Sequence, residues 1–145
     1  MTKSRVLATL AAFVVLFPAN GLFHTILAAG FFDGRLAALA PALLPMHAAK
    51  PLAVAVLDFT LAALIVYVVG RDQRPSARRG LLGGLAVNLA SSAAWNLGNT
   101  ASFAQWPLDV TLVDVAWHCA LGSVVGVAVA AVLRRSDAPS AVATA

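Results

Sequence analysis

The stretch Leu108–Leu133 reads LDVTLVDVAWHCALGSVVGVAVAAVL, and it determines the fold that we expect. Its side chains are almost all apolar, and at 1.5 Å per residue a helix of this length crosses a hydrocarbon core of about 30 Å. Thr111, Asp114 and His118 recur within it three and four residues apart, which places them on one face of a helix. We interpret the segment as a membrane-spanning helix with one polar face.

The composition of the whole chain agrees with this interpretation. Of 145 residues, 61% are hydrophobic and 11% are charged, and there is no glutamate. A soluble domain carries about 25% charged residues, so this chain cannot cover a globular surface with polar groups, and we expect the lipid bilayer to be its main solvent. The net charge of +4 does not indicate nucleic acid binding, because the basic residues are split between the chain ends and one loop.

Three other runs are also long and apolar enough to cross a membrane. The four runs cover about residues 6–32, 48–69, 80–103 and 108–133. They lack the alternation of barrel strands, so they predict an all-α, antiparallel, polytopic four-helix bundle. The first run also resembles a secretory signal peptide, but its apolar character continues beyond the usual length and no clear cleavage site follows. We expect one domain over residues 1–135 and a disordered tail over 136–145.

The basic residues predict the orientation. Eight of the ten lie before the first run, between the second and third, or after the fourth: Lys3, Arg5, Arg71, Arg74, Arg78, Arg79, Arg134 and Arg135. Only Arg35 and Lys50 fall on the opposite side. By the positive-inside rule, both termini of a multi-pass protein with this charge distribution are cytoplasmic.

Small and polar residues recur along the third and fourth runs, and they predict a packing seam between these helices. The repeats are Gly80, Gly84, Asn88, Ser92, Asn96 and Thr100 in one run, and Thr111, Asp114, His118, Gly122, Gly126 and Ala130 in the other. Small residues let membrane helices approach closely, and polar ones hydrogen-bond between them. An alternative for Gly122-x-x-x-Gly126 is a contact between two copies in a homo-oligomer.

Two stretches share the pattern polar-x-x-aromatic-His: Asn20–His24 and Asp114–His118. Because the first and fourth spans run in opposite directions, His24 and Asp114 lie at one depth, roughly 10 Å below the outer surface. If the two spans are neighbours, His24 faces Asp114 and Asn20 faces His118. Ionisable residues inside a membrane are costly and usually functional, so this is our candidate site.

The candidate site has further members at similar depth. Asp58 in the second span would close its floor, although a protonated, hydrogen-bonded carboxyl is an alternative for this residue. We expect a polar pocket that opens outward, in which His24, Asp114, His118 and Asp58 contact a ligand or proton. The expected supporting residues are Asn20, Asn88, Trp95, Asn96, Asn99 and Trp117, and for the asparagines the alternative role is hydrogen bonding between helices.

Three segments resemble a family of bacterial four-helix integral membrane proteins of unknown function. They are Asn96-Leu-Gly-Asn-Thr-Ala101, Trp106-Pro-Leu108 and Val113-Asp-Val-Ala-Trp117, which are similar to the family pattern Asp/Asn-Leu-x-Asn-x-Ala, Trp-Pro and Asp-x-x-Trp. The resemblance implies a four-helix fold in a bacterial inner membrane and a shared polar core, and it supplies no activity. Here Asn20 and Asn96 stand where the family carries aspartates, and His24 and His118 each follow an aromatic residue.

Three classes of function remain open. The first is a protein that binds or passes a small ligand, an ion or a proton, since histidine changes charge near neutral pH. The second is a haem or metal protein that uses His24 and His118 as ligands. The third is a membrane enzyme with Asp114 and His118 as an acid–base pair, which is the least favoured because no nucleophile, metalloprotease or phosphate-loop motif is present.

Overall fold

The computed structural model describes residues 2–40, 42–72 and 74–136, and no strand occurs in these ranges. The predicted all-α class is therefore confirmed, whereas the tail 137–145 lies outside the described residues. The α-helices are α1 (Lys3–Leu22), α2 (Ala29–Arg35), α3 (Pro51–Val69), α4 (Ala77–Ser102) and α5 (Leu108–Ser136).

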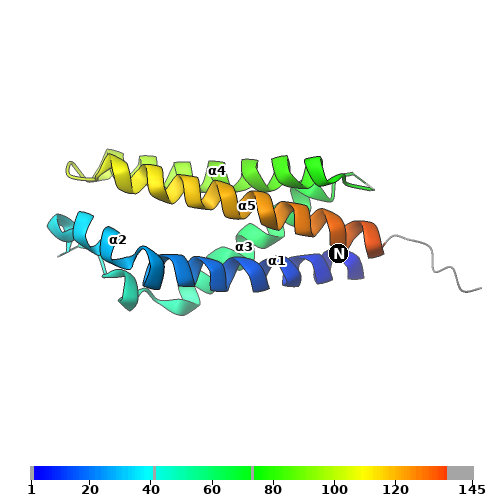
Figure 1. Cartoon of the computed structure of the whole chain (residues 1–145), viewed down its shortest axis with the longest axis horizontal. Coiled ribbons are helices and arrows are strands. Elements are labelled where there is room, and N and C mark those ends of the chain that lie inside the picture. The colour runs from blue at the N-terminus through cyan, green and yellow to red at the C-terminus, as the bar shows by residue number, and fades with distance from the viewer. Residues whose placement is uncertain (1, 41, 73, 137–145) are drawn as a thin grey trace, which may run out of the picture.

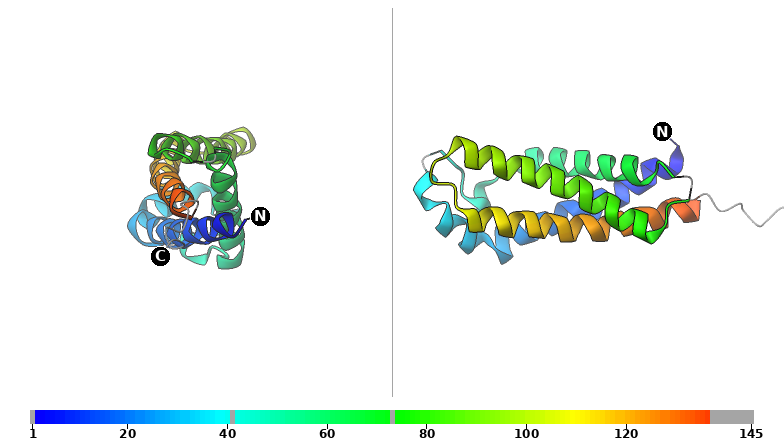
Figure 2. Two further views of the ribbon diagram at one scale, coloured as in Figure 1. Left: turned by 90° about the vertical axis from the view of Figure 1, so that its right-hand side faces the viewer. Right: turned by 90° about the horizontal axis from the view of Figure 1, so that it is seen from above.

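The four long helices form an elongated bundle, with α4 and α5 side by side, α1 beneath them and α3 crossing behind (Figure 1). Each long helix packs against two neighbours around a ring in the order α1, α3, α4 and α5, which is visible end-on in Figure 2. An additional contact joins α3 to α5. Since α1 and α5 are neighbours, residues at the same depth on these helices can meet inside the bundle.

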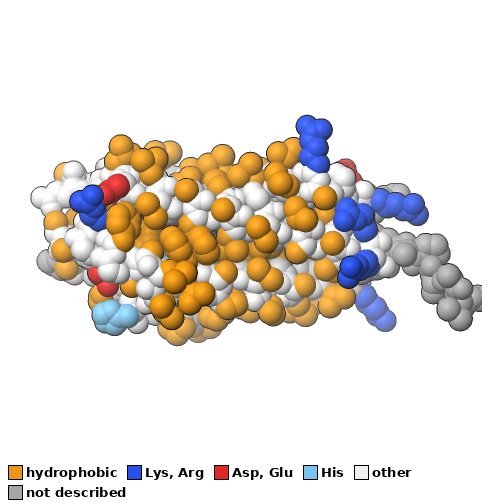
Figure 3. Space-filling model, viewed as in Figure 1, with side chains coloured by type: hydrophobic (Ala, Val, Ile, Leu, Met, Phe, Trp, Pro, Cys, Tyr) orange, Lys and Arg blue, Asp and Glu red, His pale blue; other side chains and the backbone are white. Residues whose placement is uncertain are grey.

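Three segments of the described chain are long and apolar enough to cross a membrane: Lys3–Leu27, Pro51–Val69 and Leu108–Arg135. Each of the three carries exposed large apolar side chains, and on the face drawn in Figure 3 hydrophobic side chains cover the middle of the molecule. The predicted third span coincides with α4, a continuous helix of 26 residues. Many of its side chains are small or polar, so it is less apolar than the other three long helices. The count of four spans therefore stays a prediction.

Glycines explain the close approach of α4 and α5. A Cβ atom added at Gly84 would collide with the backbone of Gly122, and one added at Gly126 would collide with the backbone of Gly80. Any larger side chain would force the helices apart, so the stripe of small residues is a packing seam within the chain. Gly122 and Gly126 thus have an intramolecular role, and the alternative contact between two copies stays a prediction.

The length of the first apolar run predicts one continuous α-helix. The structure instead divides the run into several helical segments. After α1 the chain makes a π-helical segment, Phe23–Leu27, in which the Ala28 amide donates to the Phe23 carbonyl oxygen at 2.8 Å. The chain then bends at Ala28 and continues as α2. Single π-turns are wider than α-turns and occur often at functional sites, and this one carries His24.

The two ends of the bundle differ in charge. Lys and Arg side chains gather at the end where α1 begins and α5 ends (Figure 3). At the opposite end, Arg35 at the close of α2 forms an ion pair with Asp109 in the first turn of α5. This exposed pair joins the two elements but contributes little to stability, because solvent screens it.

Candidate functional site

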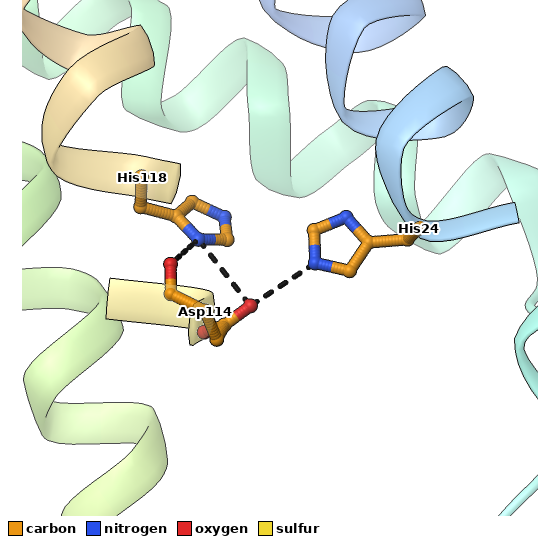
Figure 4. A group of neighbouring side chains, drawn as sticks. All are labelled: His24, Asp114 and His118. Atoms are coloured by element: carbon orange, nitrogen blue, oxygen red, sulfur yellow. Dashed lines mark hydrogen bonds and ion pairs between the residues drawn. The ribbon is translucent and has the colours of Figure 1, made fainter. Parts of the chain in front are cut away.

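The π-helical segment and α5 bring His24 and Asp114 into direct contact. His24 Nε2 lies 3.0 Å from Asp114 Oδ1, so the predicted meeting of these two residues is confirmed (Figure 4). The other ring nitrogen of His24, Nδ1, lies 3.0 Å from the backbone carbonyl oxygen of Asn20. A carbonyl oxygen can only accept, so Nδ1–H is the donor there. The proton between Nε2 and Oδ1 is carried by either the ring or the carboxyl group.

His118 lies one turn along α5 on the same face as Asp114. Its Nδ1–H donates to the Asp114 backbone carbonyl oxygen at 2.9 Å and lies 3.4 Å from Oδ1 of the same residue. Its Nε2 makes no hydrogen bond within the described residues, and Figure 4 shows this nitrogen on the side of the ring that faces His24. The centroids of the two imidazole rings are 5.6 Å apart.

Asn96 on α4 fixes the orientation of the Asp114 carboxylate. Its Nδ2 donates to Asp114 Oδ2 at 2.7 Å and also to the backbone carbonyl oxygen of Ser92 at 2.9 Å. Asn96 is 1% exposed, and its own Oδ1 is buried without a partner among the described residues. A buried hydrogen bond to a charged acceptor is among the stronger ones in proteins, so Asp114 is held from two sides.

The residues described so far form a polar cluster: His24, Asp114, His118 and Asn96. A second branch of this cluster extends from α1 to α3 and α5. Asn20 donates through Nδ2 to Asp58 Oδ1 at 2.8 Å and accepts at Oδ1 from Trp117 Nε1 at 2.9 Å. The expectation that Asn20 faces His118 is therefore wrong. Asp58 is buried on α3, and its Oδ2 has no partner among the described residues.

Three aromatic rings, those of Phe23, Phe32 and Trp117, form a group beside His24, and only Trp117 was among the predicted supporting residues. Phe23 stacks on Trp117 with ring centroids 4.1 Å apart and 4° between the planes. The buried Phe32 of α2 lies 5.2 Å from the His24 ring. The available signal was the pair of aromatic residues preceding the two histidines, which the stack brings face to face. These apolar rings lower the local dielectric and strengthen interactions between the polar groups they cover.

The structure does not bring every predicted supporting residue to the cluster. Asn88 is buried deeper along the α4–α5 seam and donates to the Gly84 carbonyl oxygen. Asn99 is buried but makes no hydrogen bond to the cluster, and Trp95 is 65% exposed on the outer face of α4. These three residues lie on α4, as Asn96 does, but their side chains do not point toward the cluster.

Access to the cluster is limited. The side chains of His24, Asp114 and His118 are 22%, 12% and 15% exposed. Two surface cavities in the described residues lie at the ends of the bundle, one beside Arg71 and one beside Met46, and neither is lined by these three residues. The expected outward-facing pocket is therefore not one of these two cavities.

A profile of the family described as Predicted membrane protein (DUF2177) matches residues 5–131. The chain belongs to this family. The match covers all four long helices apart from the ends of α1 and α5, and with them the whole polar cluster. No curated protein and no solved structure matches this DUF2177 chain.

Three side chains of this DUF2177 protein have the composition of a metal-binding group. His24, Asp114 and His118 each offer one ligand atom, and these atoms all lie within 4.8 Å of one another. Neighbouring ligands of a tetrahedral ion with bonds of about 2.0–2.1 Å lie about 3.3 Å apart. The residues present therefore fit a small metal ion after shifts of about 1.5 Å or less.

Proposed function

We propose that this protein binds a divalent transition-metal ion inside the membrane, with His24, Asp114 and His118 as its ligands. The observation that carries the proposal is the hydrogen bonding on the far side of each ligand. Each histidine donates Nδ1–H to a backbone carbonyl oxygen, so Nε2 is the nitrogen available to an ion. At His24 the ion would displace the proton that Nε2 shares with Asp114. The Asp114 carboxylate accepts a hydrogen bond from Asn96 at Oδ2, so Oδ1 is the oxygen that would bind the ion. Such partners orient the ligands of known metal sites.

The donor set favours an ion of borderline softness. Imidazole nitrogen suits Zn²⁺, Fe²⁺, Cu²⁺ and Ni²⁺, whereas Mg²⁺ and Ca²⁺ prefer oxygen ligands. Two histidines and one carboxylate leave a fourth position for water or a substrate, as in catalytic zinc sites. The buried Oδ1 of Asn96, which has no partner among the described residues, would accept a hydrogen bond from such a water molecule.

The topology that we propose places this site in the outer half of the bundle. The cluster lies away from the basic end, on the π-helical segment and the first three turns of α5. If that basic end is cytoplasmic, the chain crosses a bacterial inner membrane four times, with α4 as the third span, and the site is nearer the outer surface. The seam with α5 supports α4 as a span, because it covers the small and polar face of α4.

A haem group fits these residues less well. A haem ligated by both histidines would lie between the two imidazole rings. Here the Asp114 carboxylate lies against His24 and His118, with Oδ1 at 3.0 and 3.4 Å from their ring nitrogens. The space that a porphyrin needs is thus occupied by a side chain of the protein.

Proton transfer is a second candidate function, and one observation favours it. Both ring nitrogens of His24 face oxygen atoms, so a proton is shared between His24 and Asp114. A proton pathway predicts acidification of liposomes that requires Asp114 and is independent of metal. Metal binding without a proton pathway predicts no such Asp114-dependent acidification, and this difference separates the two candidates.

The test uses the full-length protein, purified in detergent and stripped with a chelator. We expect one Zn²⁺ or Co²⁺ ion per chain by elemental analysis, and a Co²⁺ absorption spectrum of a four- or five-coordinate site. Replacing His24 or His118 by alanine should weaken binding at least 100-fold. His47→Ala is the matched control, because this third histidine lies in the loop turn Met46–Ala48, outside the cluster. Equal metal content in all three variants would refute the proposal.

A further inference from the structure

A second candidate site lies at the opposite, basic end of the bundle. A cavity of about 410 Å³ opens between the start of α1, the loop that follows α3 and the last turns of α5. Three arginines line it, namely Arg5, Arg71 and Arg74, together with the single carboxylate of Asp72. This cavity shares no residue with the metal site proposed above, and the inference does not depend on that proposal.

The positive charge of this cavity is not compensated within the described residues. Asp72 Oδ2 lies 3.3 Å from Arg79 Nε, so the carboxylate already has a basic partner from α4. Arg71 lies over the ring of Tyr67, with 5.6 Å between its guanidinium carbon and the ring centroid. Arg74 makes no ion pair in the described part of the chain. Two guanidinium groups thus border the cavity without an acidic partner.

The third arginine is fixed in place by the backbone of the cavity wall. Arg5 donates from a terminal guanidinium nitrogen to the Gly70 carbonyl oxygen at 2.8 Å. This bond caps the carbonyl end of α3 and holds a positive charge at the cavity. The cavity also borders the beginning of α1, where the first-turn amides give a helix N-terminus its partial positive charge.

We propose that this cavity binds a phosphate group, and that the group belongs to the headgroup of an anionic phospholipid. Guanidinium groups recognise phosphate oxygens through paired hydrogen bonds. The cavity lies at the end of the bundle where the hydrophobic surface gives way to basic side chains, which is the level of lipid headgroups (Figure 3). Basic pockets between helix ends on the cytoplasmic side of membrane proteins suit such headgroups. A soluble phosphate would use the same chemistry, so the test separates the two sources.

The experiment measures lipid binding to the full-length protein in detergent by native mass spectrometry. Phosphatidylglycerol and phosphatidylcholine of identical acyl chains are compared. We expect phosphatidylglycerol to bind at least tenfold more tightly. The double variant Arg71→Gln/Arg74→Gln should lose roughly tenfold to thirtyfold in phosphatidylglycerol affinity. The variant Arg71→Lys/Arg74→Lys keeps the charge and should retain part of the affinity.

The matched control is Arg78→Gln/Arg135→Gln, which removes the same charge from the same end of the bundle outside the cavity wall. It should change the affinity by less than threefold. Equal binding of the two lipids, or equal losses in both double glutamine variants, would overturn the proposal. Inorganic phosphate is added in a parallel titration. Displacement of the lipid by millimolar phosphate, dependent on the two cavity arginines, would support the phosphate site but assign it to a soluble ligand.

Discussion

Replacing Asn96 by leucine tests how the proposed metal site is held together. Leucine has the same number and branching of side-chain heavy atoms but cannot donate, so Asp114 loses the 2.7 Å hydrogen bond to its Oδ2. A hydrogen bond to a charged group contributes about 1.5–3 kcal/mol when it is buried. Loss of an outer-shell partner of this kind typically weakens metal binding 10- to 100-fold, which corresponds to about 1.4–2.8 kcal/mol. The two estimates agree in size, so we expect Zn²⁺ affinity to fall within this range.

The assay is competition for Zn²⁺ against a chelating dye, with the protein in detergent. Asn99→Leu is the matched control, because Asn99 is also buried on α4 but makes no hydrogen bond to the cluster. Both variants should remain folded, as judged by helical circular dichroism and gel filtration. Wild-type affinity in a folded Asn96→Leu protein would refute the idea that this asparagine positions a ligand. Equal weakening in both variants would point to a general effect of the substitutions.

Three further predictions concern packing and ligand linkage. Gly84→Ala should lower the melting temperature by several degrees because its Cβ would collide with α5, whereas Gly98→Ala should not, since nothing lies within 4 Å of a Cβ there; similar melting curves would argue against the glycine seam. Trp117→Phe keeps an aromatic ring but removes the 2.9 Å bond to Asn20, which should cost about 1 kcal/mol of stability in denaturant titrations. Zn²⁺ at 100 times its dissociation constant should stabilise the protein by about 2.7 kcal/mol in thermal unfolding. That gain should vanish in His24→Ala, and its survival there would show that zinc binds elsewhere.

The relative height of residues along the bundle could be predicted from the sequence. Counting residues from the ends of antiparallel spans places His24 and Asp114 at one level, and they meet at 3.0 Å. The same counting fails for Asn20, which bonds to Asp58 and Trp117 in place of His118. A count along the chain measures height on a helix but leaves open the direction in which each side chain points toward the neighbouring helices.

The rotation of α4 illustrates this difference. Trp95 and Asn96 are adjacent in sequence and nearly equal in depth, but successive helical residues point about 100° apart. Asn96 is 1% exposed and bonds to Asp114, whereas Trp95 is 65% exposed. The π-helical segment further rotates the side chains around His24, and no local sequence signal predicted this segment.

The sequence by itself determined the helical class, the apolar runs, the segregation of basic residues and the approximate level of the polar cluster. These properties follow from composition and from distance along the chain, because a bilayer sorts residues by hydropathy and depth. Only the tertiary structure decided that α1 lies beside α5, that Asn96 orients Asp114, and that Phe23 stacks on Trp117. Those outcomes depend on the rotation of each helix about its axis, which is set by packing among all four long helices together.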